Sequence, residues 1–226
     1  MERAVSATVQ PRRRRFWPTL VALALLVAAA ALYAAWPRQP DLTAFEPAAM
    51  ARLEASMWRA YYEKRYVALL RDLYAVSRDQ YNFSPLESLR IAFAAASAAK
   101  AFQPSTTRAE AAKALPPLIT YFSILTRGST ARFDVAEAAR TELAWWQARR
   151  EGAKPEQYGL TIAQVAALVY GVDNDAMAQA GVVRAQAMAY RDEKGDTIGE
   201  ADWSMIADQL RAAYALLKQA LSVRTA

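Results

Sequence analysis

The feature that most constrains this chain is an uncharged run of 21 residues from Phe16 to Trp36. A helix of this length measures roughly 31 Å, which matches the thickness of the hydrocarbon core of a bilayer. Trp17 lies near one end of the run, and Tyr33 and Trp36 lie near the other. Aromatic rings at both ends suit the two headgroup layers. The run therefore predicts a single transmembrane helix over residues 16–36.

The charges on either side of this run predict its orientation. Arg38 is the only basic residue close behind it, whereas four consecutive arginines precede it: Arg12, Arg13, Arg14 and Arg15. Basic flanks stay on the cytoplasmic side, so residues 1–15 are expected to form a basic cytoplasmic tail. The rest of the chain would then lie across the inner membrane, in the periplasm of a Gram-negative bacterium, with the helix retained as a signal anchor.

Two other interpretations of the amino terminus remain open. A cleaved signal peptide also has a basic start and an apolar middle, and Ala29 and Ala31 supply small residues for a cleavage site. The apolar run continues past them to Trp36, which favours retention. A twin-arginine export signal is the other alternative, because Arg13 to Phe16 fits part of that motif.

The net charge of +6 is concentrated at the amino terminus. The first 36 residues hold five basic residues and one acidic residue and so carry +4, which leaves +2 for the rest. A basic tail suits anionic lipid headgroups, so the bilayer is the first expected partner. The remainder has no basic stripe of the kind that binds nucleic acid, and no nucleic-acid partner is expected.

The sequence contains no histidine and no cysteine. This composition excludes His–Cys zinc sites, Ser–His–Asp and Cys–His catalysis, His-ligated haem and Glu-x-x-His di-iron bundles. Disulfides are excluded as well. We therefore expect no cofactor, no metal and no enzymatic activity of these classes.

Residues 37–46 are expected to be a short linker, and residues 47–226 an exported, all-helical domain. Apolar residues recur at helical spacing and no segment alternates with period two for long. Capping patterns, prolines and glycines divide the domain into expected helices. These span residues 47–80, 85–102, 107–125 with a kink or split at Pro116 and Pro117, 134–151, 161–170, 173–192 and 199–221. The predicted fold is all-α: one transmembrane helix followed by an irregular bundle or array of six to seven helices.

Three residues of the first expected helix are candidates for ligand or partner binding. Glu54, Trp58 and Tyr62 are spaced four apart and so share one helix face. Aromatic rings with polar tips suit binding surfaces, and a buried acid can act as a general acid. The alternative is a core face in which Glu54 forms a salt bridge with an arginine of another helix.

Two further segments carry acidic residues that are candidates for a site. Glu87-Ser88 resembles lytic transglycosylases, helical periplasmic enzymes with a catalytic Glu followed by Ser, although the resemblance covers only these two residues. Thr197 with Glu200 forms a capping pattern in a loop that is rich in oxygen ligands of the type calcium prefers. The acids there are Asp192, Asp196, Glu200 and Asp202, but the spacing of an EF-hand fails and no metal site is predicted.

These observations predict a non-enzymatic, single-pass membrane protein. Its exported helical domain would act as an accessory or scaffolding subunit that interacts with other membrane or periplasmic proteins. The alternative is a binding module for an envelope glycan, lipid or peptide, with the aromatic face of the first helix as its site. A lytic-transglycosylase-like enzyme that uses Glu54 or Glu87 is the third hypothesis.

Overall fold

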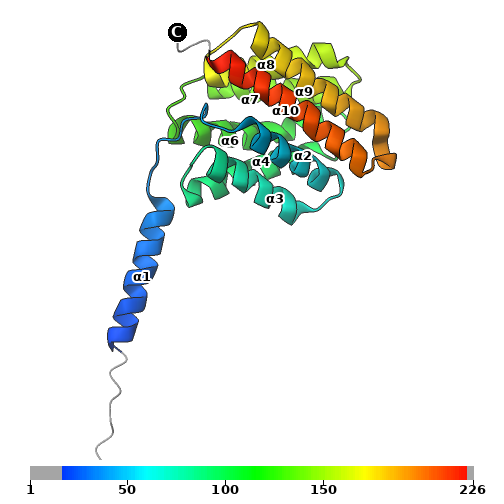
Figure 1. Ribbon diagram of the computed structural model, residues 1–226. Helices are drawn as coiled ribbons and strands as arrows, with labels where there is room; N and C mark the ends of the chain where they lie inside the picture. Colours follow the sequence, from blue (N-terminus) through cyan, green and yellow to red (C-terminus); the bar gives the residue numbers. More distant parts are fainter. Residues whose placement is uncertain (1–16, 223–226) are drawn as a thin grey trace, which may run out of the picture.

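The protein is described by a computed structural model that covers residues 17–222, so the basic tail expected at residues 1–15 lies outside the described residues. Within residues 17–222 the regular elements are helices, which confirms the all-α class (Figure 1). The elements are α1 (Trp17–Ala35), α2 (Pro47–Tyr62), α3 (Tyr66–Ala75), a π-helical turn (Val76–Gln80), α4 (Pro85–Phe102), α5 (Arg108–Ala111), a 3₁₀ turn (Ala112–Ala114), α6 (Leu115–Gly128), α7 (Val135–Arg150), α8 (Pro155–Tyr170), α9 (Asp175–Lys194), a 3₁₀ turn (Gly195–Thr197) and α10 (Glu200–Ser222).

Helix α1 stands apart from the rest of the protein (Figure 1). None of its residues is buried, and its large apolar side chains are exposed along its whole length. Among the described helices it is the one that is long and apolar enough to cross a membrane. Trp17 and Tyr33 lie near its two ends and Trp36 follows it, and all three are exposed.

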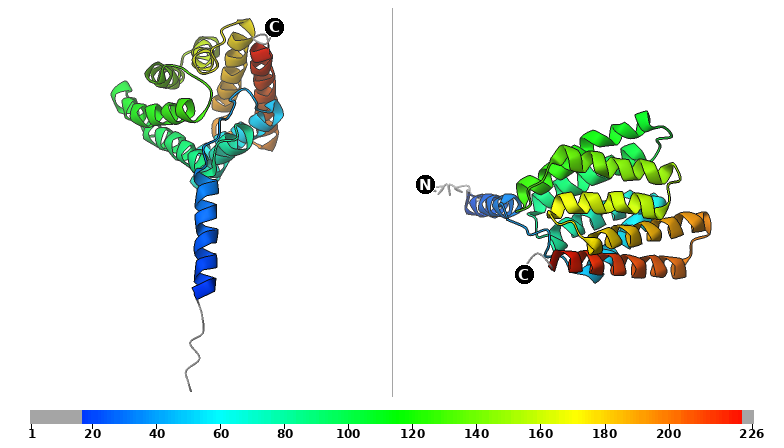
Figure 2. Two further views of the ribbon diagram at one scale, coloured as in Figure 1. Left: turned by 90° about the vertical axis from the view of Figure 1, so that its left-hand side faces the viewer. Right: turned by 90° about the horizontal axis from the view of Figure 1, so that it is seen from above.

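Apart from the short α5, the remaining helices form a closed ring. Each helix packs against the next one in the order α2, α3, α4, α6, α7, α8, α9 and α10. The last of them, α10, packs back against α2. Figure 2 shows the helices following one another around this ring.

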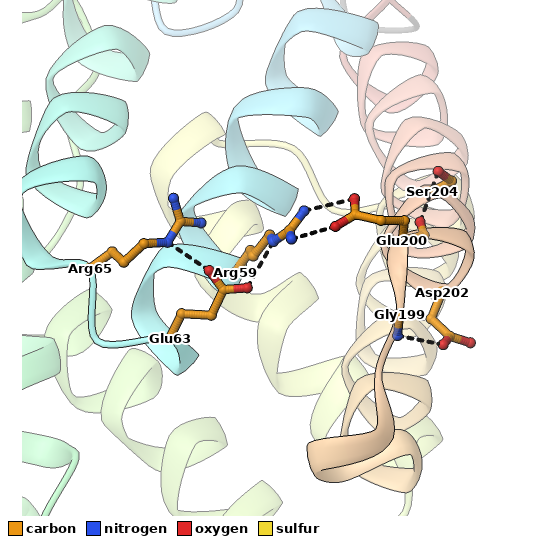
Figure 3. Close-up of polar contacts among 7 residues, drawn as sticks. All are labelled: Arg59, Glu63, Arg65, Gly199, Glu200, Asp202 and Ser204. Atoms are coloured by element: carbon orange, nitrogen blue, oxygen red, sulfur yellow. Dashed lines mark hydrogen bonds and ion pairs between the residues drawn. The ribbon is translucent and has the colours of Figure 1, made fainter.

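The contact between α2 and α10 closes the ring. Its core is apolar, since Ile206 and Leu210 are fully buried against Ala51. At the surface, Arg59 of α2 donates to both carboxylate oxygens of Glu200 at 2.9 and 2.5 Å and also to Glu63 at 2.8 Å (Figure 3). The exposed ion pairs contribute little to stability, so apolar burial is the main cause of closure.

Helices α8 and α9 cross at two glycines. A Cβ atom added to Gly181 would lie 2.3 Å from the carbonyl oxygen of Gly159, and one added to Gly159 would lie 2.7 Å from the Cα atom of Val182. Only glycine permits this approach of the two backbones. The pair fixes the position of α9, whose inner face carries Arg184.

The prediction of one helix over residues 47–80 is wrong, because the chain reverses between α2 and α3. Helix α2 ends in a Schellman motif: Arg65 N–H donates to the Ala60 carbonyl at 2.8 Å and Lys64 N–H to the Tyr61 carbonyl at 3.2 Å. Lys64 takes the left-handed conformation, with φ of 56°. A glycine usually marks this position, so the sequence carried no stop signal.

The start of α8 was also predicted wrongly, whereas α10 begins at Glu200 as expected but with a different cap. Thr161 lies inside α8, which begins at Pro155 with Lys154 as its N-cap; the side chain of Gln157 accepts from the Lys154 N–H at 3.2 Å. In α10, Gly199 N–H donates to Asp202 at 2.9 Å, in place of the expected capping pair of Thr197 and Glu200.

The other boundaries agree with the predictions to within a few residues. Ser84, Thr107 and Asp134 accept hydrogen bonds as N-caps, and Gly171 ends α8 with φ of 65°. The split expected near Pro116 and Pro117 occurs at the 3₁₀ turn Ala112–Ala114.

The segment 37–46 packs against one end of the ring. Pro40, Leu42 and Phe45 are buried there, and Lys218 of α10 donates to the carbonyl oxygens of Thr43 and Phe45 at 2.5 and 3.1 Å. This end of the ring is therefore covered by the chain that arrives from α1.

Candidate functional site: a cavity inside the helical ring

The ring surrounds a partly open cavity of about 710 Å³. Every helix of the ring contributes to its lining, which is predominantly apolar and aromatic. Seven aromatic residues from α2, α6 and α7 line it: Trp58, Tyr61, Tyr62, Tyr121, Phe122, Trp145 and Trp146. Ligand pockets typically have volumes of about 300–1,000 Å³ and a largely apolar lining with a few placed polar groups, and this cavity has both properties.

A buried ion pair lies in the cavity wall. The Arg184 Nε and Nη2 atoms donate to one oxygen of Glu54 at 2.7 and 2.6 Å, and the Tyr214 hydroxyl donates to the other oxygen at 2.6 Å. Glu54 is only 2 % exposed, whereas 27 % of the Arg184 side chain is accessible because Arg184 lines the cavity. The three residues come from α2, α9 and α10, so the pair links both sides of the ring closure.

A second carboxylate, Glu142 of α7, also lines the cavity. Its Oε1 atom accepts from the Trp146 indole N–H at 2.9 Å. Burial raises the pKa of Glu142, while the positive charge of Arg184 and indole N–H groups partly oppose that rise. Glu142 therefore binds a proton more readily than an exposed glutamate does.

Two arginines surround Tyr62 at the cavity wall, and one of them, Arg149, lines the cavity. Arg149 donates to both carboxylate oxygens of Asp192 at 2.9 and 2.7 Å and to the Tyr62 hydroxyl at 2.6 Å. The Arg191 guanidinium lies 3.2 Å from the centroid of the Tyr62 ring. These contacts fix the Tyr62 ring at the point where α2, α7 and α9 meet.

Arg150, the next residue of α7, caps the end of α4. It donates to the Phe102 carbonyl oxygen at 2.8 Å and to the Ser105 carbonyl oxygen, and its guanidinium lies 3.8 Å from the Phe102 ring centroid. Cations are favoured at helix carboxyl ends, so Arg150 has a structural partner as well as a place in the cavity lining.

Tyrosine hydroxyl groups supply further polar atoms to the cavity. The Tyr81 and Tyr170 hydroxyls lie 3.3 Å apart, and Tyr121 comes from α6. Burial raises the pKa of each of these tyrosines above the usual value, and it raises the pKa of Tyr61 to about 12. All four are neutral at physiological pH and act as hydrogen-bonding groups.

The three candidate residues from the sequence meet in this cavity. Glu54, Trp58 and Tyr62 all line it. The salt bridge that was the alternative for Glu54 is present, and its partner is Arg184. A role of these residues in binding stays a prediction.

Sequence reasoning missed the contribution of α7. Glu142, Trp145, Trp146, Arg149 and Arg150 recur at helical spacing and all line the cavity. Acidic and basic residues that share one helix face with two tryptophans are a detectable signal, because charged residues are uncommon on a helix face that packs into the core. Arg184 lies in an alanine-rich helix and had no comparable signal.

The other acidic candidates lie outside the cavity or in separate ion pairs. Glu87 accepts from the Ser84 hydroxyl at 2.8 Å at the start of α4 and does not line the cavity. Glu200 pairs with Arg59 and Asp192 with Arg149. The hydrogen bond from Tyr190 at 2.5 Å and the Gly199 N–H lower the pKa of Asp202 to about 2. Across residues 17–222 no three acidic residues gather in a geometry that would hold a metal ion.

No protein-family model matches this chain, and neither a curated protein nor a solved structure shows significant similarity to it.

Proposed function

We propose that this protein is a membrane-anchored binding module of the cell envelope, and that its ligand occupies the cavity inside the helical ring. The observation that carries the proposal is the cavity of about 710 Å³, surrounded by eight helices and lined by aromatic side chains and a small set of fixed polar groups. A ring filled by its own side chains would be more stable, because an unfilled apolar cavity costs free energy in proportion to its volume. A ligand of matching shape would recover that energy.

The accessory or scaffolding role remains a second prediction. It rests on the expected anchor, the short linker and the many aromatic residues of the exported part, and of these aromatics Trp58, Tyr61 and Tyr62 line the cavity in the ring interior. This placement favours a small ligand over a protein partner for these residues. Ligands with a large apolar part, such as a lipid or the apolar portion of a glycolipid, fit the lining better than a bare glycan.

Retention of α1 as an anchor is favoured by the apolar run that continues past Ala31 to Trp36, and the chain at and after the end of α1 also contacts the domain. Arg78 donates to the Tyr33 hydroxyl at 3.1 Å, and Arg38 donates to the Asn82 side chain at 2.7 Å. With the arginines Arg12 to Arg15 in the cytoplasm, the domain would lie on the periplasmic face of the inner membrane.

Topology is tested by reporter fusions after Ala226. A reporter that is active only outside the cytoplasm should be active, and the intact chain should fractionate with membranes at its full mass. An active cytoplasmic reporter, or a mature chain that begins after Ala31, would contradict the anchored topology.

Ligand binding is tested by filling the cavity. Ala99 lines the cavity on α4, whereas Ala212 is exposed on α10, so Ala99→Phe and Ala212→Phe add the same ring inside and outside. The full-length protein in lipid nanodiscs is titrated with N-phenyl-1-naphthylamine, a neutral apolar fluorophore, and the signal of empty nanodiscs is subtracted. The proposal predicts saturable binding that Ala99→Phe weakens at least about tenfold and Ala212→Phe leaves unchanged. Equal binding by the wild type and Ala99→Phe, or no saturable binding, would reject it.

A further inference from the structure

The charged residues that line the cavity differ in whether they have a partner that compensates their charge. Six lining residues are charged: Glu54, Glu142, Arg149, Arg150, Arg184 and Asp192. Arg184 is paired with Glu54, Arg149 is paired with Asp192, and Arg150 is held by carbonyl oxygens at the end of α4. Among the described residues, Glu142 forms no ion pair, and its hydrogen bond comes from the neutral indole of Trp146.

The groups around Glu142 leave its charge without full compensation. The positive charge of Arg184 from α9 acts on Glu142, but the Arg184 guanidinium already makes two contacts to Glu54. Two carboxylates therefore share one guanidinium. The hydroxyl of Tyr121 from α6 and the indoles of Trp145 and Trp146 are neutral. A further positive charge beside Glu142 would therefore be electrostatically favourable.

The aromatic residues around Glu142 suit the same kind of ligand. Trp146 is hydrogen-bonded to Glu142, and the Trp145 ring already lies 5.5 Å from the Arg184 guanidinium. Tyr121 lines the same cavity. The faces of such rings attract cations, and aromatic groups beside a carboxylate are the usual way to bind an ammonium group.

We propose that the cavity binds an amphiphile with a cationic, ammonium-type group, and that Glu142 is the counter-ion of that group. The inference rests on the proposed function, because it specifies the ligand of the same cavity. The ammonium group lies against Glu142 and the rings of Trp145 and Trp146, and the apolar part of the ligand occupies the remaining aromatic lining. An anionic amphiphile would place a second negative charge beside Glu142 and would be rejected.

The test uses three ligands with a six-carbon chain whose head groups are cationic, neutral and anionic. Full-length protein in nanodiscs is titrated by calorimetry with hexyltrimethylammonium, hexanol and hexanoate, against empty nanodiscs. The cation should bind at least about tenfold more tightly than hexanol, and hexanoate should bind most weakly. Glu142→Gln should remove the preference for the cation. Glu137→Gln, which changes an exposed residue of α7 that pairs with Arg140, should retain it.

The outcomes separate this inference from the proposed function. Saturable binding of hexanol or the naphthylamine probe without any preference for the cation would overturn the cationic ligand and leave the binding cavity intact. Failure of all probes would overturn both. If Glu142→Gln does not fold, a measurement on the wild type replaces it. The affinity for the cation should rise with pH as Glu142 loses its proton. An affinity that does not change with pH would contradict the role of Glu142.

Discussion

Arg184 of α9 and Glu54 of α2 form a two-contact ion pair across 130 residues of sequence, at the wall of the cavity and beside the contact that closes the ring. Tyr214 of α10 adds a third helix to this pair. The arrangement connects the stability of the ring to the polar lining of its interior. Substitution of either residue should therefore change the free energy of unfolding of the ring.

Removal of Arg184 should strongly destabilise the domain. Arg184→Met leaves the Glu54 carboxylate buried with a single hydrogen bond from Tyr214, and loss of one partner of a buried pair costs about 3–5 kcal/mol. The free energy of unfolding, measured by urea titration of the full-length protein in detergent and followed by circular dichroism, should fall by that amount. Arg140→Met removes an exposed arginine that pairs with Glu137 and should have a much smaller effect. Equal effects of the two changes would show that the pair is not buried in solution.

Glu142→Gln should stabilise the ligand-free protein at neutral pH. The raised pKa of Glu142 means that the folded state holds its proton more tightly than the unfolded state does. The contribution of protonated Glu142 to stability is therefore complete below the pKa that Glu142 has in the unfolded chain, near 4.5. It is lost as the pH rises through the pKa of Glu142 in the folded state. Wild type and Glu142→Gln should have similar unfolding free energies at pH 4, and the variant should be more stable at pH 8. The opposite pH trend would place Glu142 in a solvated or ion-paired environment.

The glycine crossing between α8 and α9 should not tolerate a side chain. In Gly181→Ala the new Cβ would overlap the Gly159 carbonyl and the Ala163 backbone, so the helices must separate, at a cost of about 1–3 kcal/mol. Gly199→Ala is the control, because the nearest atom to its Cβ is 3.8 Å away. Thermal unfolding should show a lower transition temperature for Gly181→Ala than for Gly199→Ala. A Gly181→Ala protein as stable as wild type would contradict the close approach.

Lys64→Gly should stabilise the turn between α2 and α3. Lys64 has φ of 56°, a conformation that costs a residue with a Cβ atom roughly 1–2 kcal/mol and costs glycine little. Part of that gain is offset by the greater entropy of glycine in the unfolded chain. We expect a small increase in the unfolding free energy. A clear loss of stability would indicate that α2 and α3 form one continuous helix, as the sequence pattern suggested.

The same turn shows how far the fold could be predicted from sequence. Helices α2 and α7 both end in a Schellman motif, with Lys64 and Gly152 in the left-handed position. Gly152 marked the end of α7 correctly, whereas Lys64 gave no local signal and two helices were predicted as one. At Lys64 the tertiary requirement that α3 pack back against α2 overrides the preference of the residue.

The start of α8 failed for a different reason. Pro155 at the first helical position and Gln157 at the third are a recognisable helix start, and Thr161 with Gln164 imitated one inside the same helix. Two local patterns competed, and nothing local distinguished them. Helix type was therefore predictable, while this boundary was not.

The candidate site was only partly accessible from sequence for a topological reason. Glu54, Trp58 and Tyr62 share one face of one helix, so periodicity was sufficient to group them. Their partners Arg184 and Tyr214 lie 130 and 160 residues away and meet Glu54 only because α10 returns to α2. Ring closure is a long-range property, and a single sequence contains no direct record of it.

The most direct test of a ligand-holding ring is native mass spectrometry of the full-length protein purified from its own membranes. The wild type and Ala212→Phe should carry one small molecule per chain that is released on unfolding, and Ala99→Phe should lack it. The cationic inference adds that this molecule bears an ammonium-type group. Wild-type protein and Ala99→Phe with the same bound mass would contradict the central claim that the cavity is the binding site.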